Sequence, residues 1–288
     1  MSSSSVLGSA VVITGASTGI GQACALELDR RGFRVFAGVR SETAAENLQA
    51  KASSRFTPLM IDVTDAASIA AAAKAVGATM GDAGLAGLVN NAGIVVPGPL
   101  EAVPIDALRR QFEVNLIGQV AVTQAFLPLL RKARGRVVNI GSINGALSIP
   151  YMGPYSASKF ALEAVTDALR VELRTWGIRV SAVEPGQIQT PIWEKSIAAA
   201  DQLSKTVAPE ILSLYEADLA ALRQAVERFA RRASPVDRVV RAVVQALTAR
   251  RPKTRYFLGW HVRLPFKGMK MLNDRVRDWL VRKQLGLS

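Results

Sequence analysis

Residues 10–21 read AVVITGASTGIG, an apolar run that passes directly into a glycine-rich turn. A helical pattern follows and stops at Gly32, a residue of the kind that ends helices. The glycines permit a tight turn and a close approach of the backbone to a phosphate group, which a helix N-terminus stabilises. The spacing of Gly15, Gly19 and Gly21 differs from the GxGxxG fingerprint, and a simple strand–helix connection would use glycines in the same way. The stretch therefore predicts strand, tight loop and helix, and leaves a phosphate site as one of two interpretations.

Short apolar runs rich in β-branched residues recur along the chain and alternate with helical segments. Continuous apolar strands separated by helices form a parallel sheet that is covered on both faces. The predicted fold is therefore α/β, a Rossmann-like doubly wound parallel sheet with helices on both faces. Strands are expected at residues 10–14, 34–39, 57–62, 85–90, 136–140, 178–184 and 255–258.

After the sixth predicted strand the pattern changes. Residues 191–233 read mainly as helices and loops, in a position where a lid could cover a substrate. We expect a single Rossmann-like domain over residues 1–258, including this helical substrate lid, and a basic amphipathic C-terminal extension over residues 259–288.

The composition is that of a folded protein from a reducing compartment. Hydrophobic residues make up 49% of the 288, and the only cysteine, Cys24, cannot build a disulfide framework. The N-terminus lacks the basic segment of a secretory signal, and glycines and prolines interrupt the longest uncharged stretch, residues 137–158. We therefore expect a cytoplasmic protein without a membrane span.

The formal charge of +13 is unevenly distributed. Residues 1–222 hold equal numbers of basic and acidic side chains, so the whole excess lies in residues 223–288. There, Trp260 and Trp279 are interleaved with basic residues, and the only histidine, His261, is expected to be structural. For the terminal amphipathic helix we favour packing on its own domain or on a second subunit. Peripheral attachment to an anionic membrane surface comes next, and nucleic acid or another acidic partner comes last.

Tyr155 and Lys159 stand four residues apart, on one face of a predicted helix. A phenol with a pKa of about 10 is a poor base at neutral pH, and a nearby cation lowers that pKa. Ser142 stands at the end of a predicted strand, at the sheet edge where active-site groups of such folds gather. The three residues predict a site that transfers a proton through a phenol.

Together with further segments, these residues resemble the short-chain dehydrogenase/reductase family over about residues 8–190. The matching segments are TGASTGIG at 14–21, NNAG at 90–93, the YxxxK pair, and EPG at 184–186 followed by Thr190. The EPG segment and the residues around Arg255 and Tyr256 are similar to those of the retinol and hydroxysteroid dehydrogenase branch. The family forms homo-dimers or homo-tetramers, so the resemblance implies an oligomer.

The resemblance implies a catalytic tetrad of Asn115, Ser142, Tyr155 and Lys159. Tyr155 would act as general base in oxidation and general acid in reduction, and Lys159 would bind the nicotinamide ribose and lower the tyrosine pKa. Ser142 would hold the substrate oxygen, and Asn115 would position a water that connects Lys159 to solvent.

The choice of cofactor rests on the end of the second strand. Val39 occupies the place where an NAD enzyme carries a carboxylate, and Arg40 follows it with a guanidinium suited to a 2′-phosphate. NADP(H) is therefore favoured, with NAD(H) as the alternative, and no metal is expected. The expected cofactor contacts are Gly15, Ser17, Thr18, Gly19, Ile20, Gly21, Arg40, Ser41, Asp62, Val63, Asn91, Ala92, Gly93, Tyr155, Lys159, Pro185, Gly186, Ile188 and Thr190. For Asp62 the other interpretation is a helix cap, with Asp65 as competitor.

The residues expected at the substrate are Ser142, Asn144, Tyr151, Tyr155 and Trp193. The segments around them are mostly apolar, which suits a lipophilic alcohol or its ketone or aldehyde. The predicted function is hydride transfer between such a substrate and NADP(H). A different class of function, a non-catalytic nucleotide-sensing or lipid-binding scaffold at a membrane surface, is less favoured because all four tetrad residues are present.

Overall fold

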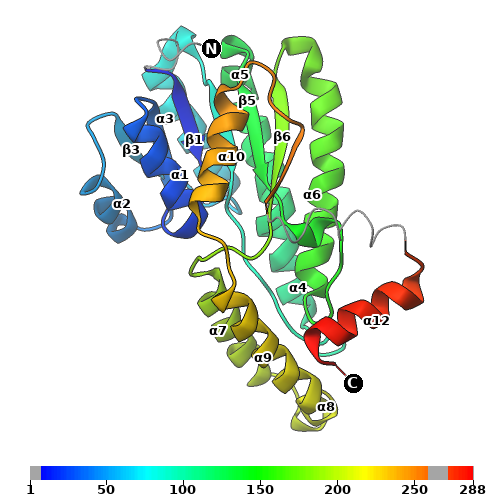
Figure 1. Ribbon diagram of the computed structural model, residues 1–288. Coiled ribbons are helices and arrows are strands. Elements are labelled where there is room, and N and C mark those ends of the chain that lie inside the picture. Colours follow the sequence, from blue (N-terminus) through cyan, green and yellow to red (C-terminus); the bar gives the residue numbers. More distant parts are fainter. Residues whose placement is uncertain (1–7, 259–271, 288) are drawn as a thin grey trace.

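The computed structural model describes residues 8–258 and 272–287 and contains a seven-stranded parallel sheet (Figure 1). The strands follow the order β3-β2-β1-β4-β5-β6-β7, and every neighbouring pair is parallel. They are β1 (Ala10–Ile13), β2 (Arg34–Val39), β3 (Phe56–Met60), β4 (Gly87–Asn90), β5 (Arg136–Ile140), β6 (Arg179–Pro185) and β7 (Arg255–Leu258).

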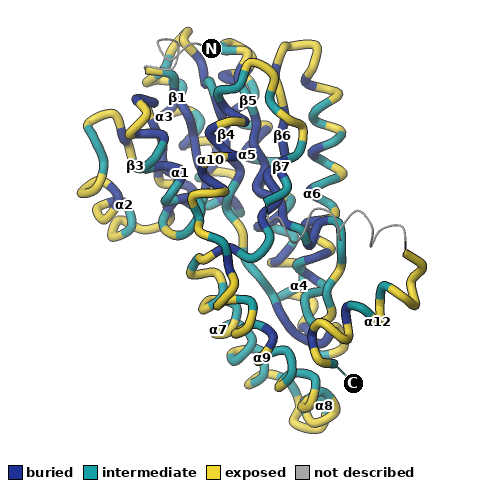
Figure 2. The backbone as a smooth tube through the Cα atoms, viewed as in Figure 1, coloured by how far each residue is buried: buried dark blue, intermediate teal, exposed yellow. Residues whose placement is uncertain are grey.

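Helices cover both faces of this sheet because successive strand residues point to opposite sides. On β1, Val11 and Ile13 join a hydrophobic cluster with α1 and α10, whereas Ala10 and Val12 join a second cluster with α3 and α5. Figure 2 shows the strands as the most deeply buried part of the molecule. The predicted doubly wound fold is confirmed. The helices packed on the sheet are α1 (Gly19–Arg30), α2 (Glu42–Gln49), α3 (Ala66–Met80), α5 (Gly118–Ala133), α6 (Gly153–Glu172) and α10 (Asp237–Thr248), whereas α4 (Ile105–Phe112) packs on α6.

Two element boundaries differ from the expected ones in a way that concerns the site. Helix α1 begins at Gly19, inside the glycine turn, so its first amide groups belong to the turn itself. Strand β3 ends at Met60 rather than at residue 62; the amide of Ile61 still makes a hydrogen bond of 2.9 Å to the carbonyl of Val39 on β2, and no strand residue follows it. Asp62 therefore lies in a loop at the carboxyl edge.

Three helices extend beyond the carboxyl edge of the sheet (Figure 1). They are α7 (Ile192–Ser204), α8 (Pro209–Leu214) and α9 (Glu216–Arg231), and Ala225 is the one fully buried residue among them. These helices form the segment that the sequence indicated as a lid. Their exposure indicates that they are held by few contacts with the main body.

The last described helix, α12 (Asp274–Leu285), packs on α9. Val281 and Leu285 are buried with Ala225, and Ile149 and Leu222 lie among the residues packed around them. Of the three roles considered for this helix, intramolecular packing is the one that the structure shows. The preceding part of the predicted extension, residues 259–271 with Trp260 and His261, lies outside the described residues.

One helical stretch in the described ranges, Ile105–Ala133, is long and apolar enough to cross a membrane. It does not stand out in the sequence as an uncharged stretch, because Asp106, Arg109 and Arg110 lie in its first turns. Half of its most apolar window is buried in the protein. There, Val122 and Phe126 belong to the core cluster on one face of the sheet, as in a core helix.

Candidate active site

A cavity of about 550 Å³ opens at the carboxyl ends of the strands. Its walls combine the glycine turn, the ends of the strands, the start of α6 and the lid helices. The expected site residues that line it are Gly15, Ser17, Thr18, Gly19, Ile20, Arg40, Asp62, Val63, Asn91, Ala92, Gly93, Ser142, Asn144, Tyr155, Lys159, Pro185, Gly186, Ile188, Thr190 and Trp193. Four expected residues are not in its lining: Gly21, Ser41, Asn115 and Tyr151.

The glycine turn has the geometry of a phosphate cradle. Gly15 and Gly19 have φ values of +64° and +60°, which disfavour a side chain. A Cβ on Gly21 would lie 2.4 Å from the carbonyl oxygen of Gly15, so this glycine acts by its small size, behind the cavity wall. Thr18 is the N-cap of α1, but its side chain does not cap the helix. The first amides of α1 are thus left for an anionic ligand, and the turn fits a dinucleotide.

Asn91 holds the turn in place from β4. Its side-chain amide donates hydrogen bonds of 3.0 Å to the carbonyls of Thr14 and Gly15. The backbone amides of Asn91 and Ala92 both donate to the Thr14 hydroxyl. This part of the NNAG segment therefore supports the turn as well as lining the cavity.

At the end of β2, Arg40 lines the cavity, but Ser41 does not. The hydroxyl of Ser41 accepts a hydrogen bond from the amide of Ala44 and caps α2. Its side-chain oxygen therefore serves as a helix cap, and a contact of Ser41 with the cofactor stays a prediction.

For Asp62 the sequence left two interpretations, a cofactor contact and a helix cap with Asp65 as competitor, and in the structure Asp65 is the residue that caps the helix. Asp65 caps α3 through the amide of Ala67, whereas Asp62 lines the cavity. Asp62 accepts hydrogen bonds from the amide and hydroxyl of Thr64, which lower the pKa of its carboxyl below the usual value, and the charge of Arg40 adds to this. Asp62 therefore presents an ionised carboxylate at the cavity.

Tyr155 and Lys159 lie on α6, in the position that their spacing predicted. The Lys159 ammonium is buried, donates a 2.8 Å hydrogen bond to the carbonyl of Ile140 at the end of β5, and lies over the Tyr155 ring. Burial raises the pKa of Tyr155, and its hydrogen bond with Ser142 opposes that effect. Burial also lowers the pKa of Lys159 to about 8, against the opposing charge of Glu163. The arrangement presents a protonated phenol, a hydroxyl and a readily titrated ammonium at one wall of the cavity.

Asn115 lies in a π-helical turn, Glu113–Ile117, between α4 and α5. Its fully buried side chain accepts a hydrogen bond of 2.8 Å from the amide of Ile94 and donates to the carbonyl of the same residue and to the Ser158 hydroxyl. Asn115 thus ties the loop after β4 to α6, behind the cavity wall. Turns of this kind are frequent at functional sites.

Tyr151, expected at the substrate, instead joins the main body to the lid. Its phenol donates a 2.5 Å hydrogen bond to Asp218 on α9, and its ring stands edge-on to that of Tyr215. Tyr215 in turn donates to Glu101. The phenol of Tyr151 is engaged by the lid and does not line the cavity, so its role in the structure is to hold α9.

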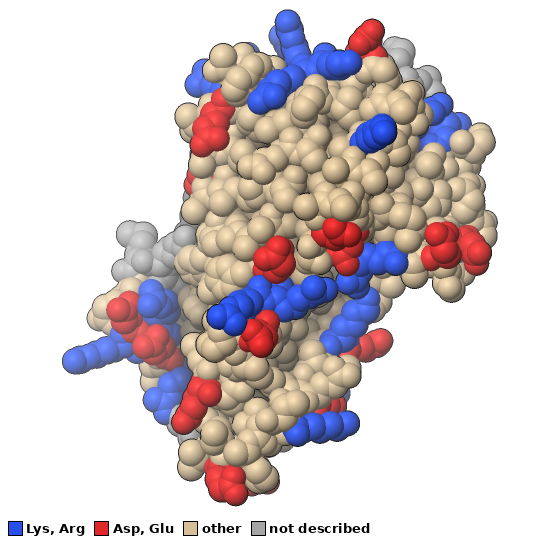
Figure 3. Space-filling view, turned by 180° about the vertical axis from the view of Figure 1, so that it is seen from behind, with Lys and Arg blue, Asp and Glu red and all other residues tan. Residues whose placement is uncertain are grey.

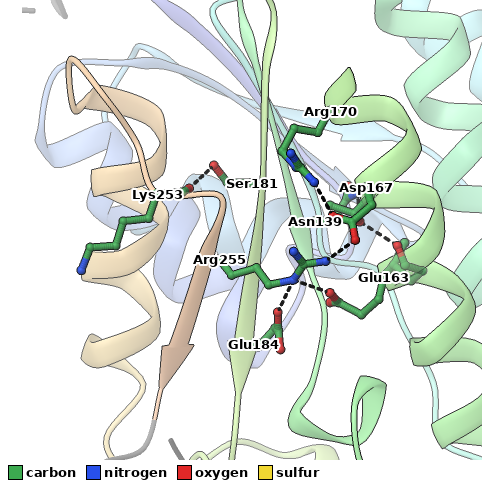
Figure 4. Close-up of polar contacts among 10 residues, drawn as sticks. Asn139, Glu163, Asp167, Arg170, Ser181, Glu184, Lys253 and Arg255 are labelled. Carbon is green, nitrogen blue, oxygen red and sulfur yellow. Dashed lines mark hydrogen bonds and ion pairs between the residues drawn. The ribbon is translucent and has the colours of Figure 1, made fainter. Parts of the chain in front are cut away.

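Three residues that had no site role in the sequence analysis lie at or next to the site in the structure. Lys195 on α7 donates a 3.1 Å hydrogen bond to the Thr18 hydroxyl, and Leu285 of α12 forms part of the cavity wall. Arg255 on β7 contacts Glu163 and Asp167 on α6 at 2.9 and 2.8 Å and Glu184 on β6 at 3.3 Å (Figure 4). Glu163 is one turn beyond Lys159, so this ion-pair cluster ties the last strand to the helix that carries the predicted catalytic pair.

A family model described as short chain dehydrogenase matches residues 9–201. The chain belongs to the short-chain dehydrogenase family. It is 37% identical over 280 residues to an NADPH-dependent 3-dehydrocapnine reductase of Ornithobacterium rhinotracheale, covering 95% of this chain and 96% of that protein. It is 40% identical over 285 residues to retinol dehydrogenase 5 of Homo sapiens, covering 95% of this chain and 89% of that protein.

Among solved structures, the short-chain dehydrogenase/reductase of Burkholderia phymatum in complex with NAD has a TM-score of 0.79 and 25% identity. The match covers 92% of this chain and 94% of that one. These likenesses confirm the predicted resemblance and show an NAD(P)-dependent oxidoreductase of this family. In the two described ranges of the chain, no group of three or more His, Cys, Asp or Glu side chains is placed to hold a metal ion.

Proposed function

We propose that this enzyme is an NADP(H)-dependent oxidoreductase that interconverts a hydrophobic alcohol and its ketone or aldehyde, with Tyr155 as the proton-transferring residue. The observation that carries the proposal is the arrangement of Tyr155, Ser142 and Lys159. The phenol, the hydroxyl and the ammonium meet at the wall of one cavity, next to a glycine turn that fits a dinucleotide. The nicotinamide supplies or accepts the hydride when it is bound.

In reduction, Ser142 donates a hydrogen bond to the substrate carbonyl oxygen and stabilises the charge that develops there. The phenol of Tyr155 transfers its proton to that oxygen, which leaves a phenolate and an alcohol. The Lys159 ammonium, held by the carbonyl of Ile140, stabilises the phenolate. In oxidation the phenolate takes the hydroxyl proton back, so the same three residues serve both directions.

Preference for NADP(H) is supported by Arg40 at the end of β2. Its guanidinium lines the cavity, and the preceding Val39 offers no carboxylate to repel a 2′-phosphate. The reductase of Ornithobacterium rhinotracheale is named as NADPH-dependent. The Burkholderia phymatum structure holds NAD, so use of NAD(H) is the alternative that the binding experiment separates.

A lipophilic substrate is supported by the walls of the cavity beyond Tyr155. The lid and α12 contribute Leu203, Leu222, Phe229 and Leu285 there, and apolar walls favour an apolar ligand. Trp193 lines the same space with its indole nitrogen held by the carbonyl of Ile188, and Asn144 adds a polar side chain beside Ser142. The name of the human relative, a retinol dehydrogenase, agrees with this substrate class.

We also propose that the enzyme is cytoplasmic and oligomeric and that it contacts a membrane surface peripherally through α12. On α12, Val276 and Trp279 are 41% and 57% exposed, and the Lys283 ammonium lies over the Trp279 ring. Exposed apolar and basic side chains on one helix suit an anionic lipid surface. In the view from behind (Figure 3), basic and acidic side chains are interspersed over the lower half of the molecule, which does not favour nucleic acid on that face. Trp279→Ser should reduce sedimentation with phosphatidylserine vesicles, whereas unchanged sedimentation would contradict this contact.

The decisive experiment measures binding and turnover separately. Fluorescence titration with NADPH and with NADH gives the cofactor preference, and consumption of the preferred cofactor is then followed with retinoid, steroid and aliphatic carbonyls. Wild type should bind NADPH more tightly and reduce at least one of these carbonyls, and Tyr155→Phe should bind NADPH equally well but lose turnover. Full activity of Tyr155→Phe would refute the mechanism. Tight NADPH binding with no turnover on any carbonyl would support the scaffold alternative.

A further inference from the structure

The first helix of the lid touches the glycine turn directly. Lys195 on α7 donates its 3.1 Å hydrogen bond to the hydroxyl of Thr18, across 177 residues of sequence. The segment that leads into α7 approaches the same turn, since a Cβ on Gly19 would lie 3.5 Å from the Cβ of Thr190. The lid thus places a cation beside the part of the cavity where the turn fits a phosphate.

Lys195 has no acidic partner to explain its position. In the described part of the chain, no carboxylate lies within ion-pair distance of its ammonium, although Glu194 is its neighbour in sequence. On the same helix, Asp201 is paired with Arg223 of α9 at 2.6 Å. Lys195 is an exposed residue at the cavity lining, and the one hydrogen bond of its ammonium in the described part of the chain is to a neutral hydroxyl, so its charge is available to an anionic ligand in the cavity.

Thr18, which accepts this hydrogen bond from Lys195, lies in the glycine turn at the start of α1. Its hydroxyl does not cap α1, so the hydroxyl and the first amides of α1 are all available to acceptor oxygens. A helix N-terminus favours negative charge, and an ammonium beside it strengthens that preference. Hydroxyl, amides and ammonium together suit a group with several anionic oxygens, and in a dinucleotide that group is the diphosphate.

We propose that Lys195 binds the diphosphate of the cofactor and thereby couples cofactor binding to closure of the lid. The inference rests on the proposed function, because it requires a dinucleotide on the glycine turn. It assigns the two cations to different phosphates: Arg40, at the end of β2, to the 2′-phosphate, and Lys195 to the diphosphate. Because Lys195 belongs to the lid, the cofactor forms part of the surface on which the lid docks.

The test compares ligands that carry different phosphates. NADPH and NADH both contain the diphosphate, whereas 2′-AMP carries only the phosphate that Arg40 is expected to bind. Lys195→Met should weaken NADPH and NADH binding to a similar degree, about tenfold, as for loss of a charge-assisted hydrogen bond. It should leave 2′-AMP binding unchanged. Lys195→Arg keeps the charge and should retain most of the affinity for both dinucleotides.

Lys205 provides the matched control, because it is likewise an exposed lysine, follows the end of the same helix and does not line the cavity. Lys205→Met should bind all three ligands like the wild type. Equal NADPH and NADH affinities in Lys195→Met and wild type would overturn the inference. Loss of 2′-AMP affinity in Lys195→Met would overturn it too, because the residue would then act at the adenosine end or on the fold.

Limited proteolysis gives a second readout that does not depend on turnover. NADPH should protect residues 191–233 from cleavage in the wild type and in Lys205→Met, but much less in Lys195→Met at saturating NADPH. The ligand 2′-AMP should protect none of these proteins. Equal protection of Lys195→Met by saturating NADPH would contradict the coupling to the lid. If the wild type bound neither dinucleotide, the proposed function itself would fail, which separates that outcome from a failure of Lys195 alone.

Discussion

The Nζ atom of Lys159 lies 5.8 Å from the centre of the Tyr155 ring, one turn further along α6. The ammonium reaches this position because the carbonyl of Ile140, the last residue of β5, accepts its hydrogen bond. The strand end and the helix together therefore set the distance between the cation and the phenol. This pair governs the chemistry that we expect of the enzyme.

Lys159→Ala should lower turnover by at least about a hundredfold, within the range that proton-transfer groups contribute. The phenolate of Tyr155 then lacks its cation, and the cavity loses a donor for the cofactor, so NADPH affinity should fall as well. Steady-state kinetics and fluorescence titration measure the two effects. Lys132→Ala, at an exposed lysine paired with Asp82, is the control and should change neither. A Lys159→Ala enzyme with normal turnover would contradict the assigned role.

The direction of the pH dependence follows from the protonation state of Tyr155. Burial raises the pKa of this phenol, so it is protonated at neutral pH. Carbonyl reduction consumes the protonated form and should stay level through neutral pH, then fall as pH rises through the pKa of Tyr155. Alcohol oxidation needs the phenolate and should rise over the same range. Rates measured from about pH 6 to about pH 11, which extends above the unperturbed tyrosine pKa of about 10, test this; a reduction rate that rises with pH would contradict it.

Arg40→Asp should discriminate between the two nicotinamide cofactors. Replacement of the guanidinium by a carboxylate removes a partner of the 2′-phosphate and adds repulsion. NADPH affinity should therefore fall by about tenfold or more, and NADH affinity should stay the same or improve. Fluorescence titration with both cofactors measures the change. Unchanged NADPH affinity would instead favour the NAD(H) alternative and leave Arg40 as a solvated surface residue.

Arg255→Met should destabilise the fold. It removes the cation that Glu163, Asp167 and the buried Glu184 share (Figure 4). Removal of one partner from a buried ion pair costs about 3–5 kcal/mol, and Arg255 is partly exposed, so a loss of roughly 2–3 kcal/mol in unfolding free energy is expected. Denaturant titration measures it.

The matched control for that cluster is Arg109→Met. Arg109 also pairs with a carboxylate, that of Asp106, but both side chains are highly exposed. The change in unfolding free energy should stay within about 0.5 kcal/mol, as for surface pairs in general. Equal stability of the Arg255 and Arg109 variants would show that the cluster contributes little to the fold.

Much of the site could be predicted because its residues follow local patterns. The four-residue spacing of Tyr155 and Lys159 sets them on one face of α6, and Arg40 follows directly from the end of β2. Spacing did not indicate two contacts that the structure shows: the Ser41 hydroxyl caps α2, and the Tyr151 phenol donates a hydrogen bond to Asp218 of the lid. A side chain near a strand end or a loop can serve a helix cap, a lid or a ligand, and spacing alone does not distinguish these uses.

The sequence by itself determined the doubly wound sheet, the glycine turn and the spacing of the predicted catalytic pair. Each of these could be predicted from patterns among residues that are close together in the chain. Only the tertiary structure decided that Lys195 meets Thr18 across 177 residues, that Tyr151 meets Asp218 across 67, and that Arg255 meets Glu163 across 92. These contacts arise where the lid and the last strand pack against elements formed much earlier in the chain. Periodicity and spacing report which face of an element a residue occupies, whereas packing decides which other element that face meets.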